Sequence, residues 1–426
     1  MHKRLFALPT FLIAGLALGQ ETMHLTLSEA ERLAIQNNPA LQSAKFTASA
    51  AGQVPVELKA GLEPTMFGSL TGVGADSGSR LAAGALNNPV VYNRLGSGLS
   101  LNQLITDFGR TSNLISSAKF RASAQDQVAE TVRANILLET HRFYFDVLRA
   151  QSILTVAEQT VSARQLVADQ VTQLAAAKLK SQLDVSFANV NLADARLQLA
   201  DAQNGLKAAI AEIATAMGIP GQQNFALAEE PMPEEPASRI EPLLEEAIQK
   251  RPELANLRLQ STAAQRFFQA EKSLSYPSIG MVASAGFVPA GQAAVPGRYG
   301  ALGANINIPI FNGGLFKARR TEAEYRALAA NKDVQDQENR IIRDVRLAYL
   351  SALNAYERVG LTAQLLDQAK LGLDLAQSRY DLGLGSIVEL SQSQLNYTSG
   401  QIANASAKYD YQVRHSLLQY QIGALR

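Results

Sequence analysis

The sequence contains no cysteine and no tryptophan, and it has only 4 histidines among its 426 residues. Without cysteine, a disulfide framework, a thiolate metal site and a nucleophilic thiol are all excluded. The histidines are scattered, and none has a carboxylate or a second histidine at metal-ligand spacing: His2, His24, His141 and His415. A glycine-rich phosphate loop and a nucleophile elbow are also missing. The sequence therefore predicts a protein that is not an enzyme and that needs no cofactor.

Charged residues are scarce as well. They make up 18% of the chain, below the quarter or so that is typical of soluble domains, and the formal net charge is +1. A nearly neutral chain is not expected to bind nucleic acid. Hydrophobic residues reach 47%, which is ample for a large folded body.

Proline and glycine are absent from Arg110 to Asn204. A single straight helix of that length would reach about 140 Å, far beyond the usual globular helix. Large and small apolar residues recur there with three-four spacing: Val185, Ala188, Leu192, Ala195, Leu199, Ala202, Leu206, Ala209, Ile213 and Ala216. This period predicts a left-handed coiled coil, and the small members, Ala188, Ala195 and Ala202, predict a helix seam of close approach. An ordinary two-stranded coiled coil is the simpler alternative.

The N-terminus has the pattern of a secretory signal. A basic start, Met1 to Arg4, precedes an apolar stretch from Leu5 to Leu18 and small residues before Gln20. The apolar stretch is shorter than the roughly 20 residues that a membrane-spanning helix needs. We therefore expect residues 1–19 to be a signal peptide. No later segment is as apolar, so any contact with a membrane is expected to use strands.

The remaining chain is a tandem duplication. The segment from Glu29 to Leu41 recurs from Leu243 to Leu254, and five later residues recur at one constant spacing: Leu101, Ile105, Gly109, Ser181 and Gly218 match Ile306, Ile310, Gly314, Ser386 and Gly423. We predict a first repeat at 20–220, a linker at 221–242 and a second repeat at 243–426. The first repeat is expected to open with a capping box at Thr26 and a helix from about 28 to 59 that Pro39 interrupts.

Each repeat contains two segments of period-two alternation, predicted as strand pairs at about 64–106 and 277–310. In the second repeat the apolar positions are Ile279, Met281, Ala283, Ala285, Phe287, Leu302, Ala304, Ile306, Ile308 and Ile310. Segments of roughly 10 residues match tilted transmembrane strands, although half of a soluble sandwich would show the same alternation. Four strands cannot close a membrane barrel, which has at least about eight, so the barrel would have to be shared between chains.

After each strand pair the sequence predicts a helical hairpin, at about 110–217 and 315–423. The turns are placed by two predicted capping boxes, Ser181 with Asp184 and Ser386 with Glu389.

Three motifs then give the chain a family resemblance. They are Asn38-Pro39-Ala40-Leu41, Phe311-Asn312-Gly313-Gly314, and Arg379-Tyr380 followed by Gly383, Gly385 and Ser386. With the duplication, the mature chain resembles the TolC-type outer membrane factors. The resemblance implies an α+β membrane protein: a homotrimer in which four strands per chain form a shared 12-stranded transmembrane β-barrel, continuous with a long coiled-coil α-helical barrel. The linker would lie at the equator of that α-barrel.

The resemblance also implies a function. The trimer would be the outer membrane exit duct of a tripartite efflux pump or type I secretion system, with its helical barrel in the periplasm. Its partners would be outer membrane lipid, a periplasmic membrane fusion (adaptor) protein and, indirectly, an inner-membrane transporter. A secreted periplasmic coiled-coil scaffold without channel activity is the alternative.

The same resemblance assigns the site residues. The entrance gate would be formed by Asp184, Glu389 and Gln392, where Gln392 replaces an acidic residue of the family's best-known member. The adaptor-docking tips would be Lys178, Leu179, Lys180 and Ser181 in the first hairpin and Leu382, Gly383, Leu384, Gly385 and Ser386 in the second. Lys178 and Lys180 stand where a glycine-containing pattern is usual, so the docking contact of the first tip is expected to differ.

Overall fold

The computed structural model describes residues 23–80, 90–221, 225–291, 293–294 and 296–425. The predicted signal peptide, residues 1–19, lies outside this range. None of the helices within it combines the length and the apolarity needed to cross a lipid bilayer. The chain divides into two compact units. We call residues up to 38, 136–236 and 350–417 the hairpin unit, and residues 39–135, 237–349 and 418–426 the sheet unit.

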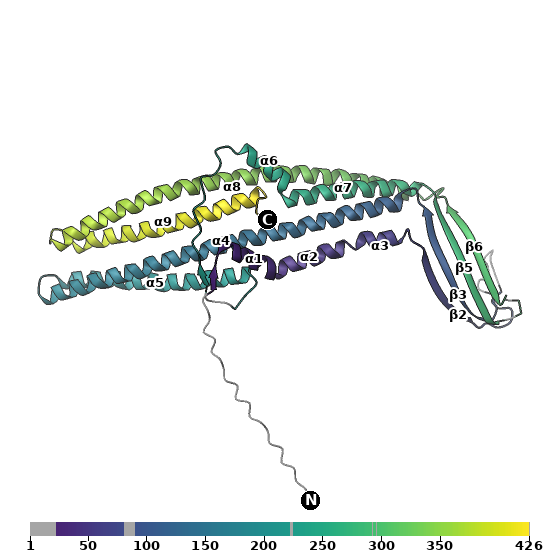
Figure 1. Cartoon of the computed structure of the whole chain (residues 1–426), viewed down its shortest axis with the longest axis horizontal. Helices are drawn as coiled ribbons and strands as arrows, with labels where there is room; N and C mark the ends of the chain where they lie inside the picture. The colour runs from purple at the N-terminus through teal and green to yellow at the C-terminus, as the bar shows by residue number, and fades with distance from the viewer. Residues whose placement is uncertain (1–22, 81–89, 222–224, 292, 295, 426) are drawn as a thin grey trace, which may run out of the picture. The chain divides into compact units, whose positions relative to one another are not determined.

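The sheet unit contains one four-stranded antiparallel sheet in the order β2-β3-β5-β6 (Figure 1). Its strands are β2 (Thr65–Val73), β3 (Arg94–Thr106), β5 (Ser278–Gly291) and β6 (Arg298–Asn307). The strand pair of the first repeat is joined to that of the second through β3 and β5. The outer strands of this sheet are therefore β2 and β6.

The register confirms the predicted alternation. Leu101 lies opposite Met66 and Ala283, and Ala283 lies opposite Leu302, so these side chains share one face. The large apolar side chains of that face are exposed in the single chain: Met66, Leu70, Leu95, Leu99, Phe287, Leu302 and Ile306. The other face carries small and polar residues such as Ser69, Gly98, Gly286 and Ser284. Its apolar exceptions include Phe67, Val73, Leu104 and Val282.

Two predicted boundaries are wrong. The last strand was expected to include Ile308 and Ile310, but β6 ends at Asn307. Pro309 has no backbone N–H to donate to a strand ladder, and it favours an end to regular pairing. The first helix was expected to be interrupted only at Pro39. The chain instead forms α1 (Leu27–Asn37), α2 (Pro39–Ala51) and α3 (Val54–Ala60), because Gly52 and Pro55 create a second break.

The hairpin unit contains the tips of two helical hairpins. The first hairpin is formed by α4 (Arg110–Ala176) and α5 (Gln182–Ala216), and the second by α8 (Leu315–Asp381) and α9 (Ile387–Gln421). α4 and α8 each have 67 residues, so each is about 100 Å long. In the sheet unit, α6 (Glu241–Lys250), α7 (Pro252–Lys272) and a short 3₁₀ helix (Ser273–Ser275) lead into β5.

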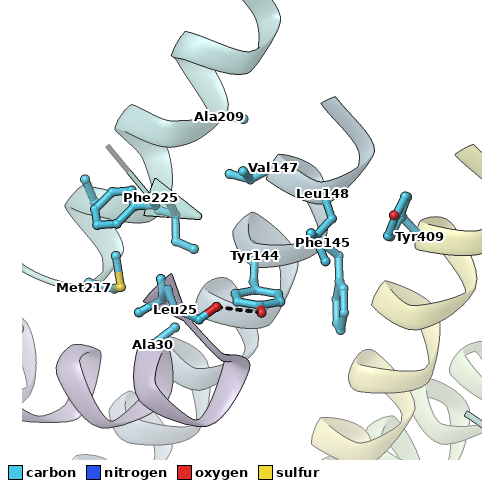
Figure 2. Close-up of a cluster of buried hydrophobic side chains, with 12 residues drawn as sticks. Leu25, Ala30, Tyr144, Phe145, Val147, Leu148, Ala209, Met217, Phe225 and Tyr409 are labelled. Carbon is cyan, nitrogen blue, oxygen red and sulfur yellow. Dashed lines mark hydrogen bonds between the residues drawn. The ribbon is translucent and has the colours of Figure 1, made fainter. Parts of the chain in front are cut away.

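Residues of the predicted linker and of the start of the described chain pack together in one buried hydrophobic cluster (Figure 2). The Tyr144 side chain of α4 is fully buried, and its hydroxyl lies 3.1 Å from the Leu25 carbonyl oxygen and 2.7 Å from that of Ala228. Leu25 is the last residue of β1 (Met23–Leu25), and Ala228 directly follows β4 (Phe225–Leu227); the two strands pair in parallel. The predicted linker at 221–242 is therefore partly regular structure and not only a connection.

Candidate functional site

The turn of the first hairpin closes with the hydrogen bonds of a Schellman motif. Leu179 N–H donates to the Leu174 carbonyl at 2.9 Å, and Lys178 N–H donates to the Ala175 carbonyl at 2.9 Å. This motif places Lys178 in the left-handed region, with φ at 62°. Such a conformation is costly for a residue with a Cβ atom.

The second hairpin repeats this turn with glycine. Leu384 N–H donates to the Arg379 carbonyl at 2.8 Å, and Gly383 N–H donates to the Tyr380 carbonyl at 3.0 Å. Gly383 has φ at 73°, and a Cβ atom built there would meet no other heavy atom within 4 Å. The two tips thus have equivalent backbones, and Lys178 occupies the position that glycine normally takes.

The capping box predicted at the first tip is confirmed. Asp184 N–H donates to the Ser181 hydroxyl at 3.1 Å, and Ser181 N–H donates to the Asp184 carboxylate at 3.0 Å. The backbone bond and then the hydroxyl bond from Ser181 lower the pKa of Asp184. The Asp184 carboxylate therefore takes part in the cap at the N-terminus of α5.

At the second tip only half of the predicted box forms. Glu389 N–H donates to the Ser386 hydroxyl at 3.1 Å, but the Glu389 carboxylate pairs with the Arg379 guanidinium at 3.1 Å. Arg379 also donates to the Leu384 carbonyl at 3.3 Å. The prediction of a complete box was wrong because an arginine at the end of α8 competes for the carboxylate. Gln392, the third predicted gate residue, is exposed and donates to Asn396 at 3.0 Å.

A contact that the sequence did not predict joins the two tips. The Lys180 ammonium lies 4.5 Å from the ring centroid of Tyr380, which is a cation–π distance. The Tyr380 side chain is buried in a cluster with residues of all four hairpin helices, among them Val171, Ala188 and Leu390. Burial, followed by the charges of Asp184 and Asp381, raises the pKa of Tyr380. Lys180 and Tyr380 therefore place the two tips side by side.

Aliphatic side chains remain exposed around this contact. Leu179, Leu382 and Leu384 are each about 70% exposed, and Leu183 and Val388 also face outward. The helix seam lies inward: Ala188, Ala195 and Ala202 are all buried. Among the residues that the structure describes, no group of His, Asp or Glu side chains is arranged to hold a metal ion.

The difference between Lys178 and Gly383 predicts opposite effects of two substitutions. Gly383→Ala should destabilise the hairpin by about 1 kcal/mol, because alanine is strained at positive φ. Lys178→Gly should leave the free energy of unfolding unchanged or raise it by up to about 1 kcal/mol. Glycine relieves the backbone strain of the folded state, but it also increases the conformational entropy of the unfolded chain, and the two effects oppose each other. Urea unfolding of the purified protein measures both. A Lys178→Gly variant less stable than Gly383→Ala would contradict this account of the turns.

Comparisons with known proteins agree with this architecture. The family model described as outer membrane efflux protein matches residues 31–219 and 243–424, one segment in each repeat. The outer membrane protein TolC of Salmonella enteritidis is 24% identical over 428 residues, with 94% of this chain and 83% of that protein covered. The alkaline protease secretion protein AprF of Pseudomonas aeruginosa is 23% identical over 431 residues, with 96% and 87% covered.

The fold is also shared with solved structures. A crystal structure of CusC has a TM-score of 0.82 to this chain at 18% identity, covering 93% of this chain and 92% of that one. Because the family model covers most of both repeats, the chain belongs to the outer membrane efflux protein family.

Proposed function

We propose that three copies of this chain form one exit duct that passively conducts substrates out of the cell. Family membership assigns the chain to the outer membrane and to efflux or secretion. The observation that supports a barrel shared between copies is the four-stranded sheet, with its exposed apolar face and its two outer strands, and the number of three copies comes from the family resemblance. Family membership also favours a duct over the secreted scaffold.

The sheet supports a barrel shared between copies. In a bilayer, backbone N–H and C=O groups on an open strand edge would lack hydrogen-bond partners, so spanning sheets close on themselves. Pairing β2 of one copy with β6 of the next satisfies both edges. Three copies then supply 12 strands, as the family resemblance implies, with the apolar face towards lipid and the small, polar face towards the lumen.

The hairpins support the same assembly independently. On α5, Leu183, Phe187, Val190 and Leu197 are all exposed and follow heptad spacing. On α8, Leu361, Leu365 and Leu375 form a second exposed apolar stripe. Apolar stripes of this kind pack against other helices in coiled coils. Contact between such stripes on adjacent copies would build the wall of an α-helical barrel in the periplasm.

The tips are proposed as the entrance and the docking surface. Three copies would bring three Glu389 carboxylates and three Asp184 carboxylates around the axis, with Gln392 one turn along from Glu389. The exposed leucines Leu179, Leu382 and Leu384 would bind an adaptor protein, which connects the duct to an inner-membrane transporter. Lys178 and Lys180 add positive charge to this surface only at the first tip.

Assembly is tested by substitutions in the α5 stripe. Phe187→Asp with Leu197→Asp should leave the detergent-extracted protein largely monomeric, because burying a charge at a packed interface is strongly unfavourable. Asn189→Asp with Gln203→Asp, at exposed positions of the same helix, adds the same charge and should leave the trimer intact. Light scattering gives the mass. A wild-type monomer would exclude the shared duct, and a trimer that tolerates the stripe substitutions would exclude the contact through the α5 stripe.

The entrance is tested with Glu389→Gln, which preserves side-chain size but removes the charge and the ion pair with Arg379. We expect divalent-cation block of single channels in planar bilayers to weaken, because three negative charges leave the axis. Glu212→Gln, at an exposed position on α5, should not change the block. Equal block in wild type and in Glu389→Gln would show that Glu389 does not face the pore.

Docking is tested without disturbing the turns. Leu382→Ser with Leu384→Ser removes two exposed leucines and leaves the glycines of the turn unchanged. Substituting Gly385 instead would strain the tip, because a Cβ atom there would lie 3.2 Å from the Tyr380 backbone nitrogen. The double variant should form a trimer of normal conductance that fails to export in cells. Leu166→Ser, at an exposed position on α4, is the control and should export normally. Full export by the double variant would place the adaptor contact elsewhere.

A further inference from the structure

The packing between α4 and α9 becomes polar over a short stretch inside the hairpin unit. Along α4, the buried residues Val156 and Ala157 on one side and Val167 and Val171 on the other are apolar. Between them lie Thr160 and Arg164, which face two buried polar residues of α9, Gln394 and Thr398. We call these four residues, Thr160, Arg164, Gln394 and Thr398, the polar layer.

Arg164 is the charged member of this layer, and its side chain is buried. Only 8% of the residue is exposed. The guanidinium donates to the Gln394 side-chain oxygen and, at 3.3 Å, to the Ser391 carbonyl. Both acceptors are uncharged, and Arg164 forms no ion pair within the part of the chain that the structure describes. Three of the five guanidinium hydrogens therefore remain for another acceptor.

The burial of the Arg164 guanidinium without an ionic partner is not explained by the stability of the folded chain alone. A buried charge without an ionic partner costs free energy, and an apolar residue at a coiled-coil core position would be more favourable. Burial lowers the pKa of Arg164, and the Asp194 carboxylate only partly opposes that effect. The Asp194 carboxylate itself accepts a hydrogen bond from Gln198 at 2.8 Å. Arg164 thus lies where an additional anion would be stabilising.

A cavity opens beside the guanidinium. It has a volume of about 310 Å³ and is lined by α4, α8 and α9, with Arg164 and Gln394 in its wall. Amide groups of Gln159, Gln377 and Gln401 also line it, and they can donate hydrogen bonds to oxygen atoms. Among the described residues that line it, Asp374 is the one carboxylate, and a carboxylate can accept hydrogen bonds from hydroxyl groups.

We propose that this cavity is a binding site for a small hydroxycarboxylate, whose carboxylate pairs with Arg164 and whose hydroxyl group donates to Asp374. The planar guanidinium fork matches a carboxylate with two parallel hydrogen bonds. Because the cavity walls come from both hairpins, the bound ligand connects the first hairpin to the second. Binding to the folded state alone then raises the stability of the protein by mass action. This inference rests on the geometry of one chain and does not depend on export.

The test uses the full-length protein in detergent, with L-malate as the probe. Calorimetric titration at constant ionic strength should show saturable binding, and thermal unfolding should shift upward with malate concentration. Arg164→Gln should weaken binding by about tenfold or more, because a charge-assisted pair is lost. Arg196→Gln removes an exposed arginine that donates to Gln165 at 2.8 Å on the first hairpin, and it should leave malate affinity unchanged.

Two further variants separate the parts of the site. Arg164→Lys keeps the charge but lacks the fork, so it should fold and still bind malate more weakly than wild type. Succinate, which lacks the hydroxyl group, should bind more weakly than malate to the wild type. Asp374→Ala removes the hydrogen-bond acceptor and should bind malate and succinate equally. The proposal is overturned if wild-type protein shows no saturable malate binding, or if Arg164→Gln and Arg164→Lys bind malate as tightly as wild type does.

Discussion

The proposed assembly depends above all on how two strand edges satisfy their hydrogen bonds. The sheet places β3 and β5 at its centre and leaves β2 and β6 as its outer strands. One face of that sheet exposes large apolar side chains, as at Leu70 and Leu302. Such a sheet is unfavourable in water because of its face and unfavourable in lipid because of its edges. In the proposed assembly, closure with further copies would remove both costs, and the duplicated strand pairs and helical hairpins would supply the same elements from each copy.

The duplication explains why the two tips are alike in backbone and different in chemistry. Both turns use the same hydrogen-bond pattern, yet Lys178 stands where Gly383 stands in the second repeat. A lysine in the left-handed region is strained, and we propose that its side chain has a role at the surface of the tip that offsets this cost. Lys180 is used differently, since its ammonium packs over the Tyr380 ring and links the tips.

The sequence predicted the features that depend on local pattern. Alternation gave the strand faces, and the Ser181 motif gave the start of α5, because each depends on residues near one another in the chain. It did not predict the ion pair of Glu389 with Arg379, because a capping-box motif does not show that an arginine across the turn competes for the carboxylate. The polar layer was also missed. A search for apolar heptads passes over Arg164, and only its partners on α9 show that it is buried.

The pairing of β2 with β6 of another copy is the central claim, and the natural absence of cysteine allows a direct measurement. Ser69→Cys on β2 can be combined in turn with a cysteine at each residue of β6, and the protein oxidised in outer membranes. Within one chain these strands are separated by β3 and β5, so they lie about 14 Å apart, too far for a disulfide. The account predicts disulfide-linked dimers and trimers on non-reducing gels for at least one pair, and none for either single cysteine. Exclusively monomeric protein across the whole β6 scan would contradict it.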